Sequence, residues 1–411
     1  MPKRRSLSLT LPKTSEWPRW VIGLWLVVLI GSAVAVVCSG VAAGLRNRRP
    51  AIALQFAPGD ARALSRMADT SLLVEDGQLR DPSEPRRYAR AALARDATLP
   101  ASWRVLGLTA PDGSALSVKL LETAERLSRR DAPTQLALIE LAVGRGDILG
   151  ALAHYDILLR ISSAYDAVLF PVLVGASTEP QIRQVLGQQL LRAPMWRRRF
   201  LAYMVNAATP YPVQADLFSA IAKGGKAFPD SDIVASQATN SALGGNYAIA
   251  RHLYGLVAPG EVTQRLRNGG FDKDGGVPPF DWQYDSDGAL TVAVASFGPG
   301  RRLEIISERG DGARAARQLL FLAPGRYRLA AQVGAIEGEP GGRPYMTMTC
   351  ADAGTPLLTV DTQPKARRVA GMVSVPNGCA VQWLELGMRQ DPNGARAAAW
   401  VDGVAIDRVG D

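Results

Sequence analysis

The chain has 411 residues, 47% of them hydrophobic, and a formal net charge of +9 at pH 7. This length allows two or three domains, and the composition fits a globular protein with one membrane segment rather than a multi-span transporter. Two histidines, three cysteines and the lack of a CxxC pair argue against most familiar zinc and nucleophile chemistries. No run of basic residues is longer than three, so we expect no nucleic-acid partner.

An uncharged apolar segment runs from Val21 to Leu45 near the N-terminus. At about 1.5 Å per residue, a helix of this length covers roughly 37 Å, enough to cross a bilayer core of about 30 Å with some tilt. Five basic residues precede the segment and three follow it. That asymmetry favours a cytoplasmic N-terminus. We therefore expect a basic cytoplasmic leader over residues 1–19 and a transmembrane helix over residues 20–45.

This reading makes the chain a single-pass protein of the inner membrane of a Gram-negative-type bacterium, with its bulk in the periplasm. A cleaved signal peptide is the alternative. The small residues Ala42 and Ala43 fit a cleavage site, whereas the leader before the apolar segment is long for a signal peptide.

Residues 58–257 are expected to form short helices, because apolar residues recur there at spacings of three and four, with Pro, Gly and Asp between the segments. The segment GDILGALAHY starts at Gly146 and GNYAIARHLY starts at Gly245. Each has an alanine five residues after its glycine and a tyrosine nine residues after it. The copies start 99 residues apart, which is close to three periods of a unit of roughly 34 residues.

This pattern resembles the tetratricopeptide repeat, with about six degenerate helix pairs between residues 58 and 257. The resemblance implies an all-α solenoid whose concave face binds protein partners. The basic run Arg197-Arg198-Arg199 is expected either to line that face or to lie on a solvated helix surface. An irregular helical domain is the alternative for the whole segment.

The pattern changes near Arg265. Beyond it Gly and Pro become frequent, and short alternating apolar runs replace the helical spacing. Runs such as residues 290–294, 327–333 and 379–388 read as strands. Segments of this length with turn residues between them are typical of a β-sandwich.

The two ends of this region carry a second resemblance. It opens with NGGFDKDGGVPPFDW (residues 268–282), closes with AAWVDGVAIDRV (residues 398–409), and contains APGRYRLAAQV (residues 323–333). These segments are similar to those of family 4 and 9 carbohydrate-binding modules. The resemblance implies that residues 266–411 form an all-β jelly-roll sandwich.

In that family a structural calcium often sits where the first and last strands meet. By the resemblance, Asp272 and Asp402 would supply oxygen ligands, which suit this ion. Two surface turn aspartates without a metal are the alternative, and Asp272 stands where the family usually has the longer Glu.

Sugar binding needs aromatic side chains that stack on pyranose rings. In the run CAVQWLEL, Trp383 alternates with Leu384 and points outward if the leucines point inward. Trp383 is therefore the first candidate, and Tyr345 and Tyr284 are weaker ones. Burial of Trp383 against the helical region is the alternative. Two further tryptophans, in the end motifs, are expected in the core: Trp282 and Trp400.

Cys350 and Cys379 lie at the end of one expected strand and at the start of another, 29 residues apart. In an oxidising periplasm they could form a disulfide. The sequence alone does not show whether their Cα atoms lie close enough for this bond.

Together these features predict a non-enzymatic periplasmic scaffold or binding protein anchored in the inner membrane. It would hold protein partners on its helices, touch polysaccharide with its sandwich, and assist polysaccharide assembly or export. One alternative is a protein-interaction platform that binds no sugar. The other is a glycan-active enzyme, although the sequence contains no GxSxG, HExxH or Walker motif.

Overall fold

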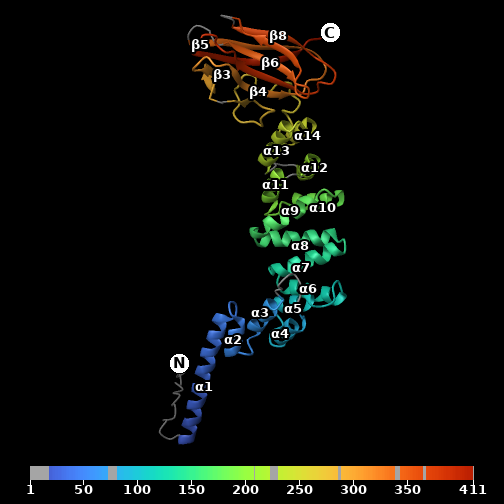
Figure 1. Cartoon of the computed structure of the whole chain (residues 1–411), viewed down its shortest axis with the longest axis vertical. Coiled ribbons are helices and arrows are strands. Elements are labelled where there is room, and N and C mark those ends of the chain that lie inside the picture. Colours follow the sequence, from blue (N-terminus) through green and yellow to red (C-terminus); the bar gives the residue numbers. More distant parts are fainter. Residues whose placement is uncertain are drawn as a thin grey trace, which may run out of the picture. The chain divides into compact units, whose positions relative to one another are not determined.

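The structure is a computed structural model that describes residues 18–72, 81–207, 209–222, 230–285, 288–337, 343–363 and 367–410. The chain divides into two compact units, Met1–Tyr165 and Asp166–Asp411. The first unit is helical. The second contains further helices followed by a β-sandwich (Figure 1). The predicted order of helices first and strands afterwards is therefore confirmed.

The first helix, α1 (Arg19–Leu45), is long and apolar enough to cross a membrane. Its apolar side chains are exposed along most of its length. By length and composition it is a candidate membrane span or a signal sequence. Nearly all of the predicted leader, residues 1–17, lies outside the described residues. At its C-terminal end, α1 packs through Ala42 against Ala53 of α2 (Pro50–Phe56) and Ala63.

The remaining helices of the first unit pack as consecutive pairs, α3 with α4, α5 with α6 and α7 with α8. They are α3 (Ala61–Thr70), α4 (Ser83–Leu93), α5 (Pro100–Leu108), α6 (Ala115–Leu127), α7 (Ala132–Gly144) and α8 (Ile148–Ile161), followed by the 3₁₀ turn η2 (Ser163–Tyr165). Arg104 of α5 is buried and links three pairs, because it donates to Asp69 of α3 at 2.5 Å and to Asp131, which precedes α7. A buried charge is tolerated only with such partners.

The helices of the second unit form two layers. They are α9 (Asp166–Ala176), α10 (Pro180–Leu191), α11 (Arg197–Asn206), α12 (Tyr211–Ala222), α13 (Ser231–Leu243) and α14 (Tyr247–Val257). α11 packs against α9 and α13, whereas α12 packs against α10 and α14. α13 and α14 also pack against each other.

The basic run at the start of α11 is neutralised within this unit. Arg197 is buried and pairs with Asp230 at 2.7 Å. Arg198 pairs with Asp232 at 2.5 Å, and Arg199 pairs with Asp166 at 2.6 Å. The three arginines therefore tie α11 to neighbouring helices, and they form neither the free binding patch nor the purely solvated surface that the sequence suggested.

The two similar sequence segments have the same structural role. Gly146 and Gly245 follow α7 and α13 with φ of 69° and 76°, a left-handed conformation that suits glycine. Ala151 and Ala250 are buried in the helices that come next. The alternate helices α5, α7, α9, α11 and α13 begin at residues 100, 132, 166, 197 and 231. This spacing is close to the predicted period, while membership of the tetratricopeptide class stays a prediction.

The described strands form two antiparallel five-stranded sheets. Sheet I has the order β1-β4-β9-β6-β7 and sheet II the order β2-β3-β10-β5-β8. Sheet I comprises β1 (Gln283–Tyr284), β4 (Ala313–Leu320), β6 (Pro344–Cys350), β7 (Pro356–Asp361) and β9 (Gln382–Met388). Sheet II comprises β2 (Thr291–Phe297), β3 (Gly300–Ser307), β5 (Gly325–Glu337), β8 (Arg368–Val375) and β10 (Ala397–Arg408).

The two sheets enclose one apolar core, as expected for a sandwich. Leu384 and Leu386 of sheet I and Leu303 and Ile305 of sheet II are all fully buried in it. The structure joins Cys350, at the end of β6, to Cys379, just before β9, in a disulfide with a Cα–Cα distance of 5.6 Å. This bond closes one end of sheet I.

Helix α14 is joined to the sandwich by a buried junction. Tyr254 of α14 stacks on Phe280 with ring centroids 4.4 Å apart. Arg267 is almost fully buried beside them, and it donates to the carbonyl oxygens of Phe280 at 2.5 Å and Leu319 at 2.6 Å. Its backbone N–H donates to Gln318 at 2.8 Å. The last helix and the sandwich therefore share one packed interface.

The boundary between the compact units lies at Tyr165, about one hundred residues before the predicted start of the sandwich domain. The last helix, α14, ends at Val257, and the first strand, β1, begins at Gln283. The domain boundaries at residues 257 and 266 stay a prediction. Independent folding of residues 266–411 stays a prediction.

Candidate functional site

The outer face of sheet I is the candidate site, and β9 sets its chemistry. Leu384 and Leu386 point into the core, so the alternating residues Trp383 and Glu385 lie on the opposite face, where both are half-buried. The predicted orientation of Trp383 relative to the two leucines is the one that the structure has.

The neighbouring strand β6 places more side chains on the same face. Thr349 is opposite Trp383, Thr347 is opposite Glu385, and Tyr345 is opposite Gly387. Trp383 and Tyr345 thus lie four residues apart along the sheet, which is about 13 Å at roughly 3.3 Å per residue. The outer face therefore carries an aromatic side chain near each end and polar groups between them.

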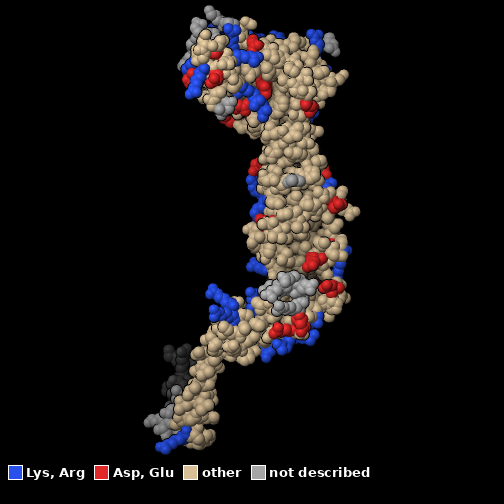
Figure 2. All heavy atoms as spheres, in the orientation of Figure 1, with Lys and Arg blue, Asp and Glu red and all other residues tan. Residues whose placement is uncertain are grey.

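Charged side chains on this face are held in a hydrogen-bonded network. Arg314 donates to Asp285 at 2.5 Å and to Glu385 at 3.0 Å. Arg389 pairs with Asp361 at 2.7 Å. Both basic and acidic side chains also gather on the side of the sandwich that Figure 2 draws.

Each of the two aromatic rings contacts one arginine side chain. The guanidinium of Arg317 lies 4.5 Å from the centre of the Trp383 ring, and that of Arg389 lies 4.2 Å from the centre of the Tyr345 ring. These distances are typical of cation–π contacts. Arg317 also donates to Gln283 at 2.9 Å. Burial and the neighbouring Arg314 lower the pKa of Arg317 from its usual value.

Sequence reasoning missed the arginines of β4 because of a β-bulge. Residues three apart on a regular strand point to opposite faces. The register shift between Arg314 and Ala316 adds one residue, so that Arg314 and Arg317 both lie on the outer face, opposite Gly387 and Glu385. Nothing in the run ARAARQLL marks this bulge in advance.

Tyr284 does not belong to this cluster. It lies on the edge strand β1 opposite Ala316, whose side chain is in the core. Its side chain therefore extends on the other side of the sheet from Trp383 and is exposed at the rim. The structure brings together two of the three predicted sugar-binding aromatics and leaves the third apart.

The two tryptophans expected in the core differ. Trp282 is buried there beside Phe271, as predicted. Trp400 is not, because Ala399 and Val401 take the core positions of β10 and place Trp400 on the outer face of sheet II. Sequence alternation could have shown this.

Trp400 forms a second aromatic cluster, on the outer face of sheet II. Its ring is 6.3 Å from that of Phe297, and the guanidinium of Arg302 lies 4.2 Å over the Phe297 ring. A Cβ at Gly334 would be 2.7 Å from ring atoms of Trp400, so the glycine lets the indole lie against β5. Packing of these side chains against one another and against β5 therefore explains why they cluster.

The two predicted calcium ligands lie close together. A Cβ at Gly270 would be 2.9 Å from an Asp272 oxygen and 3.9 Å from an Asp402 oxygen. Burial, together with the charge of Asp272, raises the pKa of Asp402. Paired carboxylates of this kind fit a hard cation, so the donor chemistry agrees with calcium.

Calcium usually takes six to eight oxygen ligands. Among the described residues, no cluster of three His, Cys, Asp or Glu side chains is placed to hold a metal ion. An ion between Asp272 and Asp402 would therefore need backbone oxygens or water as well. Calcium binding stays a prediction.

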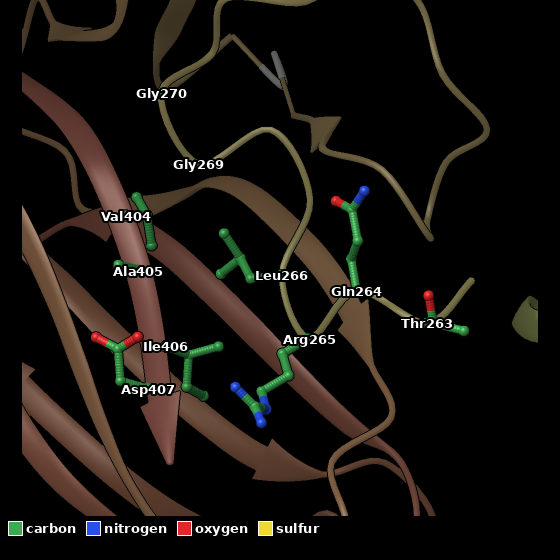
Figure 3. Close-up of a pocket in the computed structure, with 10 residues that line it drawn as sticks. All are labelled: Thr263, Gln264, Arg265, Leu266, Gly269, Gly270, Val404, Ala405, Ile406 and Asp407. Atoms are coloured by element: carbon green, nitrogen blue, oxygen red, sulfur yellow. The ribbon is translucent and has the colours of Figure 1, made fainter. Parts of the chain in front are cut away.

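A separate cavity of about 610 Å³ lies between β10 and the segment that leads into the sandwich (Figure 3). Leu266 and Val404 face it from opposite walls, and the Val404 N–H donates to the Gly269 carbonyl at 2.9 Å. None of the predicted site residues lines this cavity, so we place the candidate site on sheet I.

No protein-family model matches the chain. No curated protein matches it either. Among solved structures, TmCBM61 in complex with β-1,4-galactotriose is 14% identical, with a TM-score of 0.27, and the match covers 35% of this chain and 98% of that one. A structure described as "CBM4 structure and function" is 17% identical, with a TM-score of 0.27 and coverage of 35% and 99%. A family 16 carbohydrate-binding module is 14% identical, with a TM-score of 0.23 and coverage of 30% and 89%.

Proposed function

We propose that the sandwich binds a polysaccharide along the outer face of sheet I. The observation that supports this most directly is the placement of Trp383 and Tyr345 on one face, with Thr347 and Glu385 between them. Aromatic rings offer apolar surface to a pyranose, and the polar groups between them can hydrogen-bond its hydroxyls.

The same face favours binding over hydrolysis. Glycoside hydrolysis needs one carboxyl group that gives its proton to the leaving oxygen and a second that acts as base or nucleophile. Glu385 on the central strand β9 and Asp285, directly after the edge strand β1, both accept hydrogen bonds from Arg314. One oxygen of each carboxylate is therefore engaged with the same guanidinium. The proposal is therefore a non-enzymatic binding protein.

The wider role follows from the parts of the chain taken together. An apolar N-terminal helix would anchor the protein in the inner membrane, and a disulfide-containing sandwich suits the periplasm. The helix pairs, of tetratricopeptide type in this proposal, would hold protein partners. Such an anchored scaffold would assist the assembly or export of a surface polysaccharide.

Glycan binding by the full-length protein in detergent tests the proposal. An array of bacterial polysaccharides first identifies a ligand, and its affinity is then measured for Trp383→Ala. Truncation of an aromatic contact of this kind should weaken binding by about 1–3 kcal/mol.

Phe297→Ala is the matched control, because Phe297 is an exposed aromatic residue on the outer face of sheet II. It should leave the affinity unchanged. Failure of the parent protein to bind any glycan would favour the alternative, a protein-interaction platform without a sugar ligand.

A further inference from the structure

A groove of about 450 Å³ lies where helix α14 meets the sandwich. One wall is the start of α14, with Tyr247 and Arg251. The other wall is formed by the sandwich residues Phe321, Asp352 and Val381. Because α14 and the sandwich belong to the same compact unit and share a buried junction, this groove is a fixed feature of the fold.

The groove is continuous with the outer face of sheet I. Val381 precedes Trp383 by two residues and points to the same side of the sheet. The Tyr247 hydroxyl donates to the carbonyl of Ala351, at 3.5 Å, where β6 ends. Arg317, whose guanidinium lies 4.5 Å from the centre of the Trp383 ring, is on the same face of the sheet. A chain lying over Trp383 and continuing past Val381, just before the start of β9, therefore meets α14.

Two guanidinium groups lie along this path, one in the groove and one on sheet I. Arg251 is exposed on α14, with its guanidinium 5.0 Å from the centre of the Phe321 ring. Arg317 lies over Trp383 on the sheet. Within the described residues, neither arginine forms an ion pair with a carboxylate. Other arginines of this unit, such as Arg314 and Arg389, have acidic partners.

An arginine packed on an aromatic ring keeps its in-plane N–H groups available, and these match the two oxygens of a carboxylate. Neutral sugars do not require such groups. The one acidic residue of the groove, Asp352, is exposed on the loop after β6 and makes no ion pair within the described residues. The unpaired cations therefore exceed the unpaired acids along the path.

We propose that the polysaccharide site is composite and selects an acidic glycan: Tyr247 and Arg251 of α14 extend the face of Trp383, and Arg251 and Arg317 bind carboxylate groups of the sugar chain. This inference rests on the proposed function. It adds that the sandwich alone is an incomplete site, because one wall comes from the helical part of the chain.

The test compares a linear polyuronate with its carboxyl-reduced, neutral form as ligands of the full-length protein. The polyuronate should bind at least tenfold more tightly, and its affinity should fall as salt is raised. Arg251→Gln removes the charge and keeps most of the side chain, and it should weaken polyuronate binding about tenfold, as expected for loss of one charge-assisted contact.

Arg328→Gln is the matched control, since Arg328 is an exposed arginine on β5 of sheet II. It should bind like the parent protein. The melting temperature of each variant is measured alongside, because Arg251 is exposed and its substitution should leave the fold intact.

The outcomes separate the two proposals. Suppose that Trp383→Ala weakens binding, that Arg251→Gln binds the polyuronate as tightly as the parent does, and that the parent binds the neutral polymer as tightly as the polyuronate. The composite acidic site is then wrong and the sheet I site stands. If Arg251→Gln and Arg328→Gln weaken binding equally, the effect is general charge and the composite site is also wrong. If the parent binds neither polymer nor any other glycan, both proposals fail.

Discussion

The helix pairs of the first unit and the β-sandwich are held together by different kinds of contact. In the first unit a single buried side chain, Arg104, joins three helix pairs through two aspartates. The sandwich has one continuous apolar core, closed at one end by a disulfide. The first unit has several small apolar clusters between neighbouring helices, whereas the sandwich has one large apolar core.

This difference also explains where a binding face can arise. Each strand of the sandwich places one side in the core and the other on the outer face. Trp383 and Glu385 are therefore held in position by the core but are not part of it. A rigid support of this kind holds site residues more precisely than a loop does. Four substitutions or treatments test the contrast, and each should affect one region and leave the other unchanged.

The largest effect is expected for Arg104→Ala. Removing this arginine leaves Asp69 and Asp131 without their buried partner, which typically costs about 3–5 kcal/mol. Calorimetry of the full-length protein should show a lower transition for the first unit and an unchanged transition for the sandwich. Arg62→Ala, an exposed arginine on the same unit, is the control. Equal shifts of both transitions would contradict the separation of the two units.

Reduction of the Cys350–Cys379 disulfide should act on the sandwich alone. The two cysteines are 29 residues apart, and a loop of that size contributes about 3–4 kcal/mol on the chain-entropy model. The transition of the second unit, which contains the sandwich, should move down after reduction while that of the first unit stays in place. Free thiols at both positions in protein purified without reductant would show that the bond does not form.

Calcium should raise the sandwich transition if Asp272 and Asp402 bind it. At a free calcium concentration ten times the dissociation constant, a single site contributes about 1.4 kcal/mol. Asp402→Asn should remove the response to calcium and to a chelator, and Asp407→Asn, on the same strand, should retain it. Superimposable melting curves with calcium and with chelator would refute the metal site.

The smallest effect on stability is expected for Trp383→Ala. The side chain is half-buried and loses its contact with Arg317, which is worth about 0.5–1 kcal/mol for an exposed cation–π pair. Truncation of a core tryptophan such as Trp282 should cost about 3–5 kcal/mol. A loss of the larger size for Trp383 would mean that it is a packing residue and would weaken its assignment to a binding face.

The sequence predicted the order of helices and strands, because the spacing of apolar residues depends mainly on local geometry. It also predicted the outward side of Trp383 from its alternation with Leu384. It could not predict the role of Arg314 and Arg317, since their shared face depends on a bulge in β4. Nor could it predict that Tyr247 lies next to Ala351, because 104 residues separate them. Contacts of that range depend on the assembled fold.

Hydrogen exchange of the full-length protein, measured with and without a glycan identified on the array, tests the central claim most directly. A polysaccharide on the outer face of sheet I should slow exchange in β9 (Gln382–Met388) and β6 (Pro344–Cys350), and leave β2, β3 and the first unit unchanged. Protection confined to sheet II or to the helices of the first unit would contradict it.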